Sequence, residues 1–184
     1  MRTRAITAAM IVALITTAEG HSWYPKECCH DKDCHPVPCE EIEKISDGLY
    51  LHAGISRPVL DLQWPLYKIN SDCRDFYDKA LMDPDKFPDK NMWRIFDGEY
   101  SPFWYRGYFL DPRASQGLVD STLSFYQVGK IIVGHDIIDS VSAFYEGKVI
   151  GIDVNEHEGN SEGLLIENNV YYRIDQTGRK TPIF

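Results

Sequence analysis

From about Ile45 onward, strand-like segments alternate with segments of helical spacing, and this alternation limits the possible folds of the 184-residue chain most strongly. Residues 48–55 form an apolar run that ends in a glycine turn, which predicts a short buried strand. Residues 130–136 form a second apolar run that leads into a loop, which predicts another strand. The pattern therefore predicts an α/β domain built in layers.

Two helices are expected between these strands. Residues 61–82 carry apolar side chains at roughly helical spacing, with Pro65 confined to a first turn or a break. A second helix is expected to begin at an N-cap formed by Asp120 or Ser121 and to run to about Val128.

The last fifty residues are expected to consist mostly of β-hairpins. The first predicted hairpin spans 141–154 around the turn Glu146-Gly147. The second spans 163–175 around Asn168-Asn169, where asparagine tolerates the positive φ of a tight turn. The expected fold is thus a layered α/β domain with a hairpin-rich C-terminus.

Residues 1–20 have the features of a signal peptide. Arg2 and Arg4 precede an apolar stretch over 5–18, and small residues follow it. This stretch is shorter than the roughly 20 residues that a membrane-spanning helix needs. The sequence therefore predicts an exported, soluble protein, periplasmic or secreted.

A Cys/His-rich leader is expected over 21–44. It holds four of the five cysteines, namely Cys28, Cys29, Cys34 and Cys39. Clustered cysteines in an exported chain first indicate disulfides, in a pairing that the sequence leaves open. Because His30 and His35 lie among the thiols, a zinc site is the alternative. The remaining Cys73 is predicted to be a buried thiol.

The charge balance limits the possible partners. Lysine and arginine total 19 against 28 acidic residues, which gives a net charge of −9. Nucleic acids and anionic lipid surfaces attract a basic face through their phosphates. The composition therefore argues against nucleic acid and membrane surfaces as partners.

Two histidines and one arginine are the candidate site residues. His52 and His135 each follow a predicted strand beside a small residue, a position that holds ligands in layered α/β folds. Arg106 lies among aromatic residues and beside a glycine, and its planar guanidinium suits a phosphate or carboxylate group. Each of these residues taken alone also fits a purely structural role.

The order of these segments resembles a known family. LHAGIS at 51–56, WYRG at 104–107, VGHD at 133–136 and EGKVIGIDV at 146–154 resemble the C-terminal half of calcineurin-like metallophosphoesterases. The closest similarity is to the bacterial Ser/Thr-phosphatase-like members. The resemblance assigns residues 45–184 to such a domain and implies a partial sandwich of mixed β-sheets with flanking helices.

The same resemblance implies a function. The histidines that match His52 and His135 are ligands of a two-metal centre in that family, so two divalent ions (manganese, iron or zinc) are implied. Arg106 matches an arginine that contacts the phosphate of the substrate. A two-metal centre generates a hydroxide that attacks the phosphorus atom in line. The implied activity is metal-dependent hydrolysis of a phosphoester.

Half of the family's motifs have no match in this chain. The motifs D-x-H, G-D-x-x-D-R-G and G-N-H-E should precede residues 51–56, but they are absent from that region. A second departure is Asp136, which stands where the family usually has threonine. We therefore expect the chain alone to be inactive unless a complementing chain supplies the missing half, and to be poorly soluble or oligomeric. Strands 49–53 and 130–134 would then have unpaired edges. The alternative is a secreted module whose Cys/His-rich leader binds a metal or a partner on a β-rich scaffold.

Overall fold

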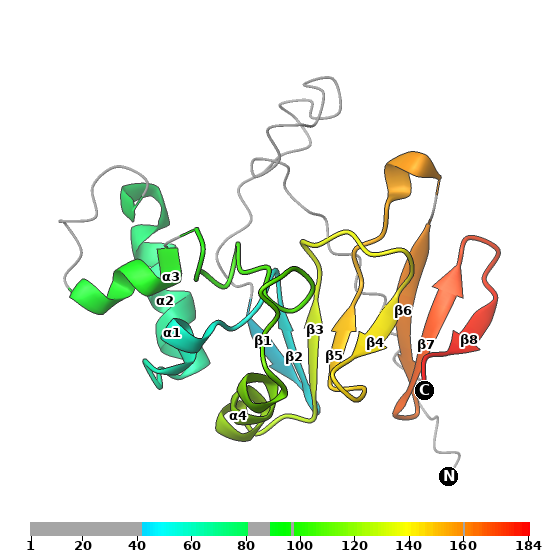
Figure 1. The fold of residues 1–184 in the computed structure, drawn as a ribbon, viewed down its shortest axis with the longest axis horizontal. Coiled ribbons are helices and arrows are strands. Elements are labelled where there is room, and N and C mark those ends of the chain that lie inside the picture. Colours follow the sequence, from blue (N-terminus) through cyan, green and yellow to red (C-terminus); the bar gives the residue numbers. More distant parts are fainter. Residues whose placement is uncertain (1–41, 81–88, 97, 160) are drawn as a thin grey trace, which may run out of the picture. The chain divides into compact units, whose positions relative to one another are not determined.

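The computed structural model describes residues 42–80, 89–96, 98–159 and 161–184, drawn in colour in Figure 1. Every described residue belongs to one compact unit of the chain. The predicted signal peptide and the four clustered cysteines lie outside the described residues, so those assignments stay predictions. Within the described residues, no helix combines the length and the apolar character that crossing a bilayer requires.

A five-stranded mixed sheet forms the centre of this unit. In spatial order its strands are β1 (Glu43–Ile45), β2 (Gly48–Leu51), β3 (Lys130–Val133), β5 (Val149–Gly151) and β4 (Ser142–Phe144). β2, β3 and β5 run parallel, whereas β1 and β4 pair antiparallel at the two edges. The β-branched residues of β3 and β5 suit strands that are covered on both faces.

The predicted unpaired edges are not observed. β2 pairs with β1 on one side and with β3 on the other, and β3 pairs with β2 and β5. The short hairpin from β1 to β2 supplies a neighbour for β2 that the sequence patterns did not reveal. Both central strands therefore have ladder partners on each side.

A second, three-stranded antiparallel sheet contains β6 (Glu162–Glu167), β7 (Val170–Asp175) and β8 (Lys180–Pro182). The turn between β6 and β7 places Asn168 and Asn169 at φ values of 53° and 63°. Asparagine tolerates this left-handed conformation better than most residues, so the predicted hairpin forms at the expected dipeptide. The turn from β4 to β5 likewise contains Glu146 and Gly147 at positive φ.

The helices follow the predicted order with different bounds. The helical segments are α1 (Arg57–Leu60), α2 (Leu66–Ala80), the 3-10 turn η4 (Lys90–Met92), α3 (Trp93–Phe96), α4 (Gln116–Tyr126) and the 3-10 turn η5 (Glu156–Glu158). α2 begins directly after Pro65, as the proline requires. α4 starts earlier than predicted because Ser115 is its N-cap and accepts a hydrogen bond from the backbone N–H of Leu118.

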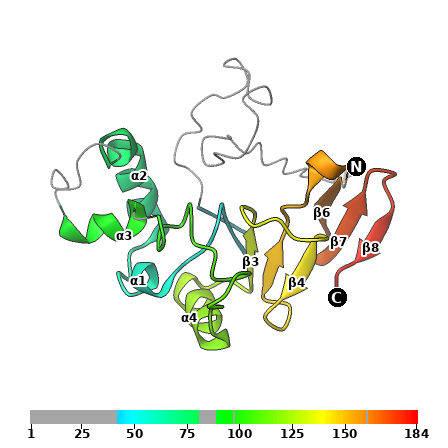
Figure 2. The same cartoon turned by 45° about the horizontal axis from the view of Figure 1, so that its top comes forward.

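The two faces of the five-stranded sheet pack against different layers. Leu49, Ile131 and Val149 point into a core that also contains buried residues of α1, α2 and α4. Ile132 and Ile150, which alternate with them, pack on the other face against residues of the three-stranded sheet. Figures 1 and 2 show helices α1–α4 and the β6–β8 sheet on opposite sides of the central strands. The predicted α/β layering with flanking helices is therefore confirmed, and of the two sheets the five-stranded one is mixed whereas the β6–β8 sheet is antiparallel.

Candidate functional site

The carboxyl ends of the three parallel strands meet at one edge of the central sheet. The register aligns Leu51, Val133 and Gly151, so the loops after β2, β3 and β5 begin side by side. The backbone N–H of Gly134 donates to the carbonyl oxygen of His52 at 2.9 Å, which fixes the first two loops together. Such an edge is where open α/β sheets hold ligands.

Both predicted histidines lie at this edge. The ring centroids of His52 and His135 are 4.7 Å apart, and the indole of Trp104 meets His135 edge-on at 5.5 Å. His135 is 2 % exposed. The structure thus brings together two imidazoles that lie far apart in the sequence.

The backbone at His135 adopts a rare conformation. Its φ is 67°, and the N–H of Asp136 donates to the carbonyl oxygen of Gly134 at 2.8 Å, closing a three-residue turn around His135. A non-glycine residue in this region is strained, and such strain persists where the surroundings fix the position. The turn directs His135 and Asp136 away from the line of β3.

Arg106 reaches this edge through Asp136. Its Nη1 donates to Oδ1 of Asp136 at 2.8 Å, and the side chains are 44 % and 3 % exposed respectively. Burial raises the pKa of the Asp136 carboxyl to about 6, an effect that Arg106 opposes and Asp153 reinforces. The arginine therefore has one end anchored by a buried carboxyl group while much of its side chain faces solvent.

Hydrogen bonds hold the loop that carries Arg106 against the loop after β2. The N–H groups of Ala53 and Gly54 donate to the carbonyl oxygen of Pro102 at 2.9 and 3.3 Å. The N–H of Ile55 donates to the hydroxyl of Tyr108, which is fully buried. These bonds fix the WYRG segment relative to His52.

We call the cluster formed by His52, Trp104, Arg106, His135 and Asp136 the strand-end site. Sequence patterns identified both histidines and the arginine. The ion pair between Arg106 and Asp136 and the contact between Trp104 and His135 were not foreseen. The signal available in the sequence was a carboxylate, that of Asp136, directly after the candidate His135, where it could pair with the candidate Arg106.

The residues present do not fit a two-metal centre. Across the described ranges, no group of three or more His, Cys, Asp or Glu side chains is arranged to hold a metal ion. Catalytic zinc sites use about three protein ligands for a single ion, and the imidazole pair alone falls short of that. This finding contradicts the prediction of two divalent ions bound through His52 and His135.

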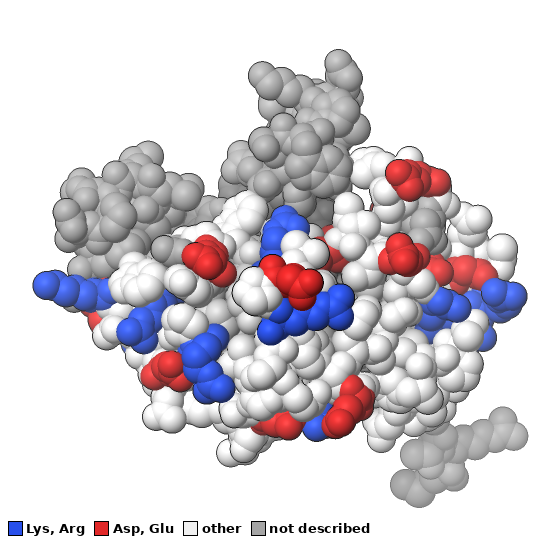
Figure 3. Space-filling model, in the orientation of Figure 1, with Lys and Arg blue, Asp and Glu red and all other residues white. Residues whose placement is uncertain are grey.

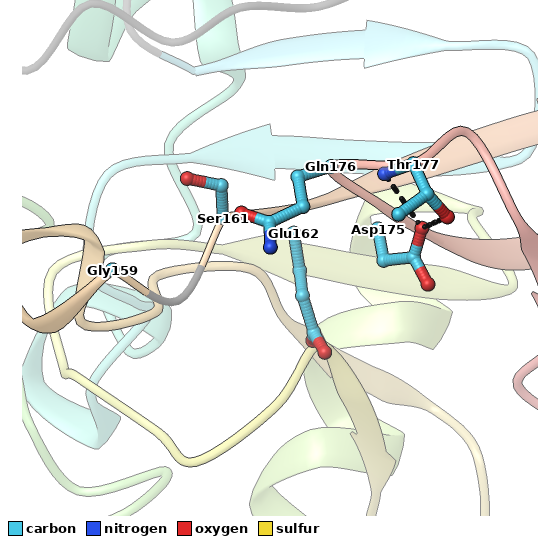
Figure 4. A pocket seen from close by; sticks show the side chains of 6 residues that line it. All are labelled: Gly159, Ser161, Glu162, Asp175, Gln176 and Thr177. Carbon is cyan, nitrogen blue, oxygen red and sulfur yellow. Dashed lines mark hydrogen bonds between the residues drawn. The ribbon is translucent and has the colours of Figure 1, made fainter.

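Two surface cavities lie elsewhere in the structure. One, of about 110 Å³, is shown in Figure 4 and is lined by Gly159, Ser161, Glu162, Asp175, Gln176 and Thr177. There the N–H of Thr177 donates to the carboxylate of Asp175, so this acid already has a local partner. The other, of about 230 Å³, lies between residues of α1 and α4 and includes Arg57 and Phe125. Neither cavity is lined by a residue of the strand-end site.

The surface charge is mixed. On the face shown in Figure 3, basic and acidic side chains are interspersed. An electrostatic footprint for nucleic acid consists instead of basic side chains clustered on one face. This arrangement agrees with the acidic overall composition.

Solved structures share this α/β fold. The crystal structure of the cold-active protein-tyrosine phosphatase of the psychrophile Shewanella sp. matches with a TM-score of 0.69 and 32 % sequence identity, covering 78 % of this chain and 43 % of that one. A further structure of a cold-active protein tyrosine phosphatase matches with a TM-score of 0.67 and 33 % identity, covering 77 % of this chain and 41 % of that one. The present chain therefore spans less than half the length of these structures. No protein-family model matches the sequence, and no curated protein does so either.

These comparisons correct the predicted family. The similar structures are named protein-tyrosine phosphatases, whereas the sequence motifs predicted a calcineurin-like metallophosphoesterase. The predicted two-metal phosphoesterase activity is contradicted on the same ground, and the alternative of a Cys/His-rich binding module gains no support. A histidine after a strand and an arginine in an aromatic loop define a position in the fold, and unrelated chemistries can share that position.

Proposed function

We propose that this chain acts on phosphomonoesters and that the phosphoryl group binds at the strand-end site. The observation that carries this proposal is the similarity to protein-tyrosine phosphatases at 32 % identity over 78 % of the chain. A phosphoester as the substrate class agrees with these neighbours. Their names further support an aryl phosphate, such as phosphotyrosine, as the specific substrate.

Arg106 is the group best suited to contact the phosphoryl oxygens. A guanidinium carries five N–H donors, and the bond to Asp136 engages only Nη1. The planar fork of the remaining donors matches two oxygens of a phosphate group. Because Asp136 is buried and fixed, it holds the guanidinium at the edge of the sheet instead of leaving it to sample many rotamers.

Two imidazoles lie beside this anion contact, with ring centroids 4.7 Å apart. An imidazole carries a ring N–H that can donate a hydrogen bond to a phosphoryl oxygen. Asp136 contributes a further acidic group whose pKa is about 6. Below that pH the carboxyl is mostly neutral, so it no longer repels a phosphate anion.

Ligand binding tests the proposal directly. The full-length chain is titrated with phenyl phosphate at pH 5.5 and observed by NMR, alongside Arg106→Ala and the matched control Arg113→Ala. Loss of a hydrogen bond between charged groups should weaken binding by about tenfold or more in Arg106→Ala. Arg113 is also exposed and lies farther along the same loop, outside the strand-end site, so its replacement should have little effect. Absence of binding, or equal effects of the two changes, would overturn the proposal.

Activity is tested separately through the release of inorganic phosphate from a phosphotyrosine peptide. His52→Ala and His135→Ala should each lower any release, because both rings lie at the same edge of the sheet. Turnover that is unaffected by either change would remove the strand-end site from the reaction.

The organisation of the N-terminal part is also a proposal. We infer that residues 1–20 direct export, that 21–44 form a Cys/His-rich leader and that the product is periplasmic or secreted. N-terminal sequencing of the protein from the culture medium or the periplasm tests this. An intact Met1 in a cytoplasmic fraction would contradict it.

A further inference from the structure

Tyr145 has an unusual backbone conformation in the turn between β4 and β5. Its φ is 52°, in the left-handed region that hairpin turns normally fill with Gly, Asn or Asp. Among the described non-glycine residues with positive φ, only His135 and Tyr145 carry a ring, and His135 belongs to the strand-end site. A bulky side chain in this conformation is strained, and such strain persists where other contacts hold the residue. The contacts of the Tyr145 side chain therefore need an explanation.

The hydroxyl of Tyr145 reaches the loop that carries Arg106. It donates to the carbonyl oxygen of Tyr108 at 3.1 Å, and it lies 3.4 Å from the carbonyl oxygen of Gly107. A hydroxyl has one proton, so the shorter contact is the main bond. Burial raises the pKa of Tyr145, so the hydroxyl keeps this proton at neutral pH. The turn is thus connected to the two residues that directly follow Arg106.

This bond differs from the others that hold the same segment. The carbonyl oxygen of Arg106 accepts from two backbone N–H groups of the turn that follows, at 3.1 and 2.9 Å. The carbonyl oxygen of Gly107 accepts from the N–H of Ala114 at 2.6 Å. These donors belong to the loop itself, whereas the hydroxyl bonded to Tyr108 comes from a turn of the central sheet. Tyr145 therefore fixes the segment after Arg106 to that sheet.

Arg106 is thereby held at two points. Asp136 fixes the tip of the side chain through the 2.8 Å bond from Nη1. Tyr145 fixes the neighbouring backbone, and its ring meets that of Tyr108 edge-on with the centroids 6.0 Å apart. A side chain that is already held binds a ligand at a smaller entropic cost than one that must first be ordered. The hydroxyl of Tyr145 therefore affects how readily Arg106 can receive an anion.

We propose that Tyr145 is a positioning residue for Arg106: its hydroxyl holds the backbone of the WYRG segment where the guanidinium meets Asp136 and can bind a phosphoryl group. This inference rests on the proposed function, because it takes Arg106 as the phosphate contact. Without the hydroxyl the segment gains freedom, and phosphate binding must then order the arginine at the expense of affinity. Tyr145 itself does not touch the phosphate in this arrangement.

The test is a double-mutant cycle on the binding of inorganic phosphate by the full-length chain, measured by NMR. Tyr145→Phe removes only the hydroxyl and should weaken binding by about threefold to tenfold, as expected for one lost hydrogen bond. Tyr126→Phe is the matched control, because its hydroxyl also donates to a backbone carbonyl, that of Trp64, at 3.3 Å and should leave phosphate binding unchanged. In the Arg106→Ala background, Tyr145→Phe should cause no further loss, because Tyr145 acts through the arginine.

A second measurement requires no phosphate. Rotation about the Nε–Cζ bond of Arg106 exchanges its two Nη groups, and the bond from Nη1 to Asp136 slows that rotation. Tyr145→Phe should accelerate the exchange of the two ¹⁵Nη signals by about threefold or more, and Tyr126→Phe should not.

The outcomes separate the two proposals. Equal effects of the two phenylalanine variants on phosphate binding, an undiminished effect of Tyr145→Phe beside Arg106→Ala, or unchanged exchange of the Nη signals would overturn the positioning role and leave the proposed function intact. If the wild-type chain binds no phosphate but the exchange still accelerates in Tyr145→Phe, the proposed function fails while the hold of Tyr145 on Arg106 is supported.

Discussion

Replacing Asp136 by asparagine should make the protein more stable at neutral pH while leaving its stability near pH 4 almost unchanged. The carboxyl group of Asp136 is buried, and it accepts a hydrogen bond from the partly exposed Arg106. A buried carboxylate loses its hydration, and this cost grows as the group ionises. Asparagine keeps the shape and an oxygen that accepts from Arg106, but it does not ionise.

The size and sign of the effect come from the pKa of Asp136. This pKa is about 6 in the folded chain, against an ordinary value of 3.8, because burial disfavours the charged form. Between these values the folded state holds a proton that the unfolded state has lost, so the free energy of unfolding falls as the pH rises. Each pKa unit corresponds to about 1.36 kcal/mol, and with solvent screening at Arg106 the loss from pH 4 to pH 7 is about 2 kcal/mol. Asp136→Asn should abolish this loss.

The assay is urea denaturation of both proteins between pH 4 and pH 7.5, followed by tryptophan fluorescence. The difference in unfolding free energy between variant and wild type should change by about 2 kcal/mol across that range. Asp120→Asn is the control, because hydrogen bonds from Lys148 and Gln116 lower the pKa of Asp120 and its contribution is lost as the pH falls. A constant difference between Asp136→Asn and wild type at all pH values would refute the account of Asp136 as a buried carboxyl group with a raised pKa.

Four further predictions concern two glycines, the cysteines and the metal content of the protein. Gly54→Ala should lower the free energy of unfolding by about 1–3 kcal/mol in urea titrations, because its Cβ would lie 2.8 Å from ring carbons of Tyr105 and Tyr108. The same change at Gly117, where α4 has room for a Cβ, should instead raise it by about 0.5–1 kcal/mol. Thiol titration of the denatured, unreduced protein should find at most one free thiol among the five cysteines, and four or five would contradict the predicted disulfides. Desalted protein should retain less than one equivalent of manganese, iron or zinc by elemental analysis, since two imidazoles bind such ions weakly, and stoichiometric retention would show that further ligands are present.

Local sequence patterns predicted the elements of the fold well where a pattern reflects a requirement of burial or of backbone conformation. The apolar runs at 48–55 and 130–136 did form β2 and β3, because continuous apolar sequences suit strands that are covered on both faces. The asparagine pair between β6 and β7 marked a turn that requires positive φ. The start of α4 was missed because Gly117 is a weak helix former, although Ser115 before it is a strong N-cap.

Pairing between strands was less predictable than the strands themselves. β1 contains only Glu43–Ile45 and carries too few residues to show a period, yet it covers the outer edge of β2. The expectation of an open edge failed because it relied on a family comparison instead of the local hairpin. A three-residue strand next to a turn is stabilised by its partner, and its own sequence gives little indication of it.

The location of the site could be predicted, but its chemistry could not. A residue that follows a parallel strand lies at the carboxyl edge of the sheet. Pairing of β2 with β3 therefore brings His52 and His135 close together. What the pair does depends on groups contributed by other segments, and here those groups are the Arg106–Asp136 ion pair and the ring of Trp104. A metal centre requires several more oxygen or nitrogen ligands at fixed distances, whereas an anion site requires one well-held cation. Asp136 holds Arg106 in place as the second arrangement requires, and this is why we propose that the arginine recognises a phosphoester.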